Sequence, residues 1–77
     1  MRIRLYGRLA DAIAPEIDLA ADGWTVGEVR LRLAADHAAA AHSLARSRAL
    51  IADRVVDDGQ PVDESDELEF LPPVSGG

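Results

Sequence analysis

The group that is most suited to a chemical reaction lies at the end of this sequence. The last seven residues are Leu71-Pro72-Pro73-Val74-Ser75-Gly76-Gly77, so two prolines separate a charged, alternating segment from two terminal glycines. Proline fixes φ and donates no backbone hydrogen bond, and we therefore expect a strand to stop at Pro72 and the chain to continue extended. Glycine lets the walls of a partner's channel close around bare backbone, and the α-carboxylate of Gly77 is unhindered. We interpret this tail as the functional group and the rest of the chain as the domain that delivers it.

Two terminal glycines also have a simpler explanation. Chain ends are frequently disordered, and glycines there are often spacers. At an average glycine usage near 7%, a terminal Gly-Gly arises by chance in roughly one chain in 200. The Pro-Pro pair favours the functional interpretation, because a stiff segment directly after a strand aims the glycines in one direction.

No other part of the sequence indicates an active site. The chain has no cysteine and no lysine, which excludes disulfides, thiol nucleophiles, thiolate metal sites and Schiff-base chemistry. His37 and His42 are five residues apart, a spacing that does not place them on one helix face, so we expect no metal site. The carboxylates fall in turns and on outward strand positions, where we expect them to be solvated. We therefore expect a protein with no catalytic side chain and no bound cofactor of its own.

The composition restricts the class of partner. At 77 residues the chain predicts one domain, near the lower size limit for a core without disulfides or metals. Its net charge of −6 and pI near 4.6 argue against nucleic acids and anionic membranes and favour a basic partner surface. No apolar run reaches membrane-spanning length and no signal segment opens the chain, so we expect a cytoplasmic protein.

Period-two alternation predicts strands at residues 2–6, 16–19 and 67–71, and residues 49–56 are interpreted as one long strand. Residues 7–15 are interpreted as a turn-like loop, and residues 38–48 as a short helix or an ordered loop. The last strand needs a neighbour on each side, which makes a mixed sheet the simplest arrangement.

The main helix has a clear start signal. Thr25-Val26-Gly27-Glu28 fits a capping box, and Trp24 and Val29 occupy the two positions of a hydrophobic staple. The helix is expected to fray near His37. A mixed sheet packed on one main helix is the α+β arrangement called β-grasp, or ubiquitin-like. We assign residues 1–72 to this domain and residues 73–77 to an extended tail.

The alternation also separates an inner from an outer face of the sheet. Three outward apolar residues, Tyr6, Val55 and Leu71, are expected to form an exposed patch beside the tail, of the kind that marks an interface. The predicted core consists of Ile3, Leu5, Ile17, Leu19, Val26, Val29, Leu33, Leu50, Ala52, Leu68 and Phe70.

The ending from Leu68 to Gly77, Leu-Glu-Phe-Leu-Pro-Pro-Val-Ser-Gly-Gly, resembles that of the small subunit of molybdopterin synthase, the MoaD family. Residues 2–6, the Thr25-Val26-x-Glu28 helix start and Asp66-Glu67-Leu68 are also similar to the family, and the resemblance covers the whole chain. The sister family of thiamine sulfur carriers, ThiS, shares Gly-Gly but usually lacks Pro-Pro-Val-Ser.

Two positions depart from the MoaD pattern. Ala52-Asp53-Arg54 stands where the family often has Ala-Val-Asn, which puts one partner contact in doubt. Ser65 replaces the glycine of the family's Asp-Gly-Asp before the last strand, which suggests a different turn. Neither departure touches the tail.

The resemblance implies a sulfur carrier. An E1-like enzyme would adenylate Gly77 with ATP, and a sulfurtransferase or cysteine desulfurase would convert it to a thiocarboxylate. The large subunit of molybdopterin synthase would bind the tail along Pro72, Pro73, Val74 and Ser75, and Gly76 and Gly77 would form its reacting end. It would use two successive sulfurs to build the dithiolene of molybdopterin from a cyclic pterin precursor. The catalytic side chains would belong to that large subunit, and ATP to the activating partner.

Three alternatives stay open at this point. In the first, the chain is a sulfur carrier for thiamine or another pathway, which the auxotrophy caused by its deletion would distinguish. In the second, it is a ubiquitin-like modifier joined through Gly77 to amines, which stable isopeptide adducts would support. In the third, it is a β-grasp adaptor with an inert tail, and deleting Gly76 and Gly77 would change nothing.

Overall fold

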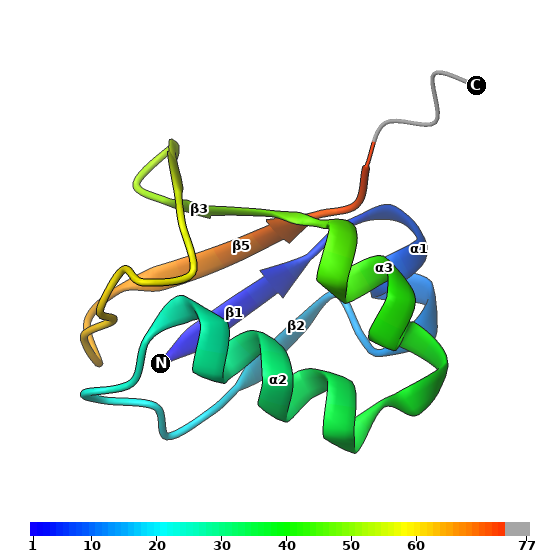
Figure 1. Ribbon diagram of the computed structural model, residues 1–77, viewed down its shortest axis with the longest axis horizontal. Coiled ribbons are helices and arrows are strands. Elements are labelled where there is room, and N and C mark those ends of the chain that lie inside the picture. Colours follow the sequence, from blue (N-terminus) through cyan, green and yellow to red (C-terminus); the bar gives the residue numbers. More distant parts are fainter. Residues whose placement is uncertain (74–77) are drawn as a thin grey trace.

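The chain folds into a sheet with helices on one of its faces, shown in Figure 1 as a computed structural model that describes residues 1–73. None of the helices in this range is long and apolar enough to cross a lipid bilayer. The elements in chain order are β1 (Arg2–Leu5), α1 (Gly7–Ala12), β2 (Glu16–Asp18), α2 (Val26–Asp36), the 3₁₀ helix η1 (Ala38–Ala40), α3 (Ala41–Arg46), β3 (Arg48–Ile51), β4 (Arg54–Val56) and β5 (Glu67–Leu71).

Within residues 1–73, the sheet has five strands in the order β2-β1-β5-β3-β4. β5 is central: it runs parallel to β1, with Ile3 opposite Leu68, and antiparallel to β3, with Ala49 opposite Phe70. α2 packs across one face of this mixed sheet (Figure 1). The predicted β-grasp fold, with its last strand away from the edges, is therefore confirmed.

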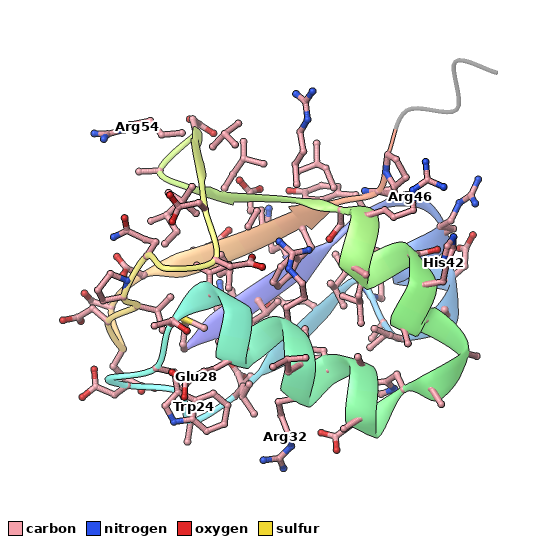
Figure 2. All side chains as sticks on the ribbon, in the orientation of Figure 1. Trp24, Glu28, Arg32, His42, Arg46 and Arg54 are labelled. Carbon is pink, nitrogen blue, oxygen red and sulfur yellow. The ribbon has the colours of Figure 1, made fainter. Side chains whose placement is uncertain are left out.

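The start of α2 follows the predicted capping box. The backbone N–H of Glu28 donates to Thr25 Oγ1 at 3.2 Å, and the N–H of Thr25 donates to Glu28 Oε1 at 2.9 Å. These bonds satisfy two amides that a helix start leaves without partners. Trp24 and Glu28 lie together at this end of the helix (Figure 2), and the helix ends at Asp36, next to the predicted position.

Residues 7–12 form helix α1, where the sequence predicted a loop. The residue before the helix, Tyr6, makes no side-chain capping bond, so no local start signal exists. Leu9 is fully buried and joins the core. Such a short helix is unstable alone, and packing of its apolar side chain supplies the stability that its local sequence lacks.

The prediction of one long strand at residues 49–56 was wrong. The segment is a hairpin of β3 and β4, whose two turn residues, Ala52 and Asp53, have φ of 52° and 64°. Two left-handed residues in a row are typical of the tight turn that matches the twist of adjacent strands. Asp53, one of the departures from the MoaD pattern, thus occupies a turn position that aspartate tolerates better than valine does.

The predicted inner and outer faces are reversed in β3, whereas Val55 of β4 is exposed as predicted. Ala49 is buried, whereas Leu50 is half-buried on the opposite face and Ala52 is exposed in the turn, so Leu50 and Ala52 were wrongly placed in the core. Ile17 and Leu19 are partly buried and pack against the core, and the other predicted members are buried. The core also contains residues that alternation did not indicate, namely Met1, Leu9, Ala21, Ala40, Leu44, Ala49 and Val62.

Candidate functional site: the exit of the C-terminal tail

The tail leaves the sheet from the end of its central strand. Phe70 is fully buried, Leu71 is 37% exposed on the outer face, and Pro72 and Pro73 are half-buried. The buried Phe70 therefore anchors the strand one residue before its end, and the two prolines follow at the surface of the domain. The other predicted site residues, Val74, Ser75, Gly76 and Gly77, lie outside the described residues, and their roles stay predictions.

Gly7 makes room for the first proline. A Cβ atom on Gly7 would come within 3.0 Å of Pro72 Cγ, closer than nonbonded carbons normally approach, and the backbone there has φ of +56°. Both the close contact and the left-handed backbone favour glycine. Sequence reasoning missed this residue, because nothing local connects Gly7 with a proline 65 positions later.

The three apolar residues predicted for the outer face are all exposed. Tyr6 is 37% and Val55 is 64% exposed, and Tyr6 follows Leu5, which lies opposite Phe70, so that Tyr6 and Leu71 are at the same end of the sheet. Leu50 lies opposite Val55 and diagonal to Leu71. The four residues Tyr6, Leu50, Val55 and Leu71 are hereafter called the outer patch. Sequence reasoning missed Leu50 because it placed the residue on the wrong face.

Several charged side chains of β1, β2 and β5 next to the outer patch are paired with one another, whereas Arg48, opposite Leu71, forms no ion pair within residues 1–73. Arg4 Nε lies 3.2 Å from Glu67 Oε1, and Arg2 Nε lies 3.2 Å from Glu16 Oε2. The Tyr6 hydroxyl donates a hydrogen bond to Glu69, which holds the pKa of this phenol above its ordinary value of 10.0. Tyr6 is therefore neutral under physiological conditions, and this side of the exit presents an apolar ring within a largely neutralised surround.

A pocket of about 300 Å³ at the base of the tail shares Leu71 with the outer patch and is hereafter called the tail-base pocket. It is lined by Arg46, Arg48, Leu71, Pro72 and Pro73. Arg46 ends α3 and Arg48 begins β3, and pairing of Arg48 with Leu71 brings both arginines to the base of the tail. Sequence reasoning did not identify either arginine.

The described part of the exit holds an apolar patch, two arginines and two prolines, but no nucleophile paired with a base. Such a surface is suited to binding a partner and aiming a chain into it, and not to covalent chemistry on side chains.

The sequence model of the ThiS family matches residues 3–77. This chain belongs to the ThiS family. The match includes the tail and β1 through β5, so the ubiquitin-like fold of sulfur carriers extends over the whole described domain. No curated protein is significantly similar to the chain in sequence.

Several solved structures share the fold over nearly the full length. SAMP1 from Haloferax volcanii is 25% identical, with 99% of this chain and 97% of that chain covered and a TM-score of 0.74. A putative molybdopterin converting factor subunit 1 from Pyrococcus furiosus is 17% identical, with 95% of each chain covered and a TM-score of 0.75. A complex of subunits 1 and 2 of the molybdopterin-converting factor from Helicobacter pylori matches at 22% identity, 99% and 96% coverage and a TM-score of 0.71.

Proposed function

We propose that this ThiS-family protein is the cytoplasmic sulfur-carrier subunit of a molybdopterin synthase and donates sulfur from a thiocarboxylate on Gly77. The observation that carries the proposal is the family match through Gly77, together with the Pro-Pro-Val-Ser-Gly-Gly ending that resembles MoaD. The β5 strand and Pro72 support it, because they begin the tail at an anchored, exposed point of the domain.

The chemistry requires activation by a partner. A carboxylate is a poor acyl donor, so an E1-like enzyme joins a Gly77 oxygen to the α-phosphorus of ATP and pyrophosphate leaves. A persulfide of a sulfurtransferase or cysteine desulfurase then attacks the acyl carbon and AMP leaves. A second thiol cleaves the sulfur–sulfur bond, which gives the thiocarboxylate and a disulfide. This chain contributes only the acyl group, since it has no cysteine or lysine.

The residues around the tail exit act in the next reaction step, the transfer of sulfur. The large subunit of the synthase receives the tail, and the outer patch of Tyr6, Leu50, Val55 and Leu71 docks against it. The Helicobacter pylori structure, in which subunits 1 and 2 form a complex, supports such a partner. Confinement of the tail in a pocket orients the thiocarboxylate toward the pterin precursor at low entropic cost. The catalytic side chains are those of the large subunit.

A second function has specific support. SAMP1 structures from Haloferax volcanii and Methanosarcina acetivorans, the latter described as a small archaeal modifier protein, are each 25% identical to this chain. In this alternative the activated Gly77 is joined to amines of other proteins. The activation step is common to both functions, and only the acceptor differs.

The decisive experiment is the intact mass of the full chain after incubation with ATP, an E1-like enzyme and a persulfide donor. We expect the mass change of one oxygen exchanged for one sulfur, and no change in a variant that lacks Gly77. Transfer of that sulfur to the pterin precursor by a large subunit would identify the molybdopterin pathway, and rescue of thiamine auxotrophy instead would point to the sister pathway. Adenylation without sulfur incorporation would favour the modifier, and no reaction at all would overturn both functions.

A further inference from the structure

The tail-base pocket differs in charge from the protein as a whole. The chain carries a net charge of −6, which favours a basic partner, yet two of its eight arginines line this one pocket of about 300 Å³. The rest of the described lining is Leu71, Pro72 and Pro73, so none of these residues offsets the positive charge. Any protein that encloses the tail must place part of its rim against this basic spot.

Four of the eight arginines are paired with an acidic side chain: Arg2, Arg4, Arg30 and Arg32 each lie within 3.2 Å of an aspartate or glutamate oxygen. The other four, Arg8, Arg46, Arg48 and Arg54, form no ion pair within residues 1–73. Of these four, Arg46 and Arg48, both exposed, line the tail-base pocket together. Their guanidinium groups can therefore meet an external carboxylate without breaking an ion pair within residues 1–73. A guanidinium binds a carboxylate in a planar, two-bond geometry that an ammonium cannot provide.

From this arrangement we infer that the tail-base pocket binds acidic side chains at the rim of the enzyme that activates the tail. This inference rests on the proposed function and adds the chemistry of the recognised surface. The net charge of −6 favours a basic partner surface, but at the rim where the tail enters, the inferred partner surface is acidic.

Exposed charges and buried apolar surface contribute differently to association. Exposed ion pairs mainly raise the rate of encounter and set orientation, and they are weakened by salt. An apolar patch contributes mainly to the lifetime of a complex. A carrier must leave its activating enzyme after each cycle, so steering by Arg46 and Arg48 fits this transient encounter, whereas the outer patch fits the longer-lived complex with the large subunit.

The test uses the full chain and an E1-like enzyme that adenylates the wild type, with pyrophosphate release as the readout. For the double variant Arg46→Glu/Arg48→Glu we expect kcat/KM to fall by roughly tenfold or more, with the loss mainly in KM. The loss should shrink as ionic strength rises. Because Arg46 lies in the last turn of α3, where a cation is favourable, Arg46→Gln/Arg48→Gln is measured in parallel and thermal unfolding of each variant is followed.

The matched control is Arg32→Glu/Arg54→Glu, which changes the net charge by the same amount. Arg32 and Arg54 lie away from the tail exit in Figure 2, whereas Arg46 lies beside it. We expect the control to retain most of the wild-type kcat/KM at every salt concentration. Equal losses in the two double variants, or no loss in either, would overturn the inference while the proposed function stands. Failure of the wild type to be adenylated would overturn the proposed function, and the inference with it.

Discussion

The two ends of β5 use their polar groups in opposite ways. The strand begins on the left of Figure 1. At this end, acidic side chains accept hydrogen bonds within the preceding loop. Asp63 accepts hydrogen bonds from the N–H of Ser65 at 2.9 Å and from its hydroxyl at 2.8 Å, and Asp66 accepts one from the N–H of Asp63 at 2.9 Å. Glu64 pairs with the ammonium of Met1. At the end where the tail leaves, Arg46 and Arg48 have no such acidic partner within residues 1–73.

This contrast separates charges that stabilise the fold from charges that are available for recognition. A loop without regular structure needs side chains to satisfy its backbone amides, and the beginning of β5 uses its carboxylates for that purpose. The tail end needs no such help, because β5 there is held by strands on both sides and by the buried Phe70. Polar and apolar groups around the exit can therefore serve a partner.

Arg30 is an exception to this contrast, because it lies near the tail end of β5 and yet has several internal partners. Its replacement should have the largest effect on stability. Its side chain is 13% exposed and lies over the Phe70 ring at 5.1 Å. It also donates to the carbonyl and hydroxyl oxygens of Ser47, at 3.0 and 2.7 Å, and to the carbonyl oxygen of Leu44. We expect Arg30→Ala to lower the free energy of unfolding by about 2–3 kcal/mol, because buried acceptors lose their donor.

Urea unfolding checks this value, with Arg32→Ala as the control. Arg32 pairs with Asp36 across one helical turn and is 50% exposed, so its removal should cost about 0.5 kcal/mol or less. Similar losses of unfolding free energy in the two variants would show that Arg30 behaves as a surface charge. Arg30 would then be no exception, and it would join Arg46 and Arg48 as a charge that does not stabilise the fold.

The outer patch should give an intermediate effect, visible in binding and not in folding. We expect Tyr6→Ala/Leu71→Ala to weaken the affinity for the large subunit by roughly tenfold, since truncation removes apolar groups from the centre of the interface. Both side chains are 37% exposed in the free protein, so the fold should persist. The control in a calorimetric titration is Leu31→Ala, a 71% exposed leucine of α2. An unchanged affinity of the double variant would remove the outer patch from the docking surface.

The smallest expected effect concerns the carboxylate that closes the loop before β5. Hydrogen bonds from the backbone N–H of Ser65 and then from its hydroxyl hold the pKa of Asp63 below its ordinary value of 3.8. A lowered pKa in the folded state contributes stability above the unfolded pKa, and this contribution is lost as pH falls through the folded value. We therefore expect Asp63→Asn to be slightly less stable than the wild type near neutral pH.

Melting temperatures measured from pH 7 down to acidic pH check this prediction. The difference between Asp63→Asn and the wild type should be constant well above pH 3.8 and should disappear as pH falls through the lower pKa of the folded state. Asp11→Asn is the control, because the carboxylate of Asp11 makes no hydrogen bond or ion pair with another residue in the range 1–73. A difference that does not change with pH would mean that the Asp63 charge is not what closes the loop.

Much of the fold could be predicted because it depends on short-range signals. The capping box of Thr25 and Glu28 involves residues three apart, and the alternation in β1 and β5 assigns Ile3, Leu5, Leu68 and Phe70 to the core without reference to any partner. Proline at position 72 stops the last strand through its own covalent structure. These features were predicted correctly because each carries its cause within a few residues.

The errors all concern features that depend on distant residues. Helix α1 exists because Leu9 is buried by segments far away in sequence. The turn at Ala52 and Asp53 pairs Leu50 with Val55 and so puts both on one face, whereas a continuous strand would put them on opposite faces. The register of β3 against β5, with Ala49 opposite the buried Phe70, decides that this is the outer face. A Gly7 that must avoid Pro72 gives no local signal at all.

By itself, the sequence determined the strand pattern, the helix start and the chemistry available to the chain, because these follow from residue types and their nearest neighbours. Only the tertiary structure decided what surrounds the base of the tail. Pairing of β3 with β5 places Arg48 opposite Leu71, and the end of α3 adds Arg46. Arg48 and Leu71 are 23 positions apart in sequence, and the register that pairs them is set by packing of the whole core, so the surface that a partner meets could not be predicted from local sequence.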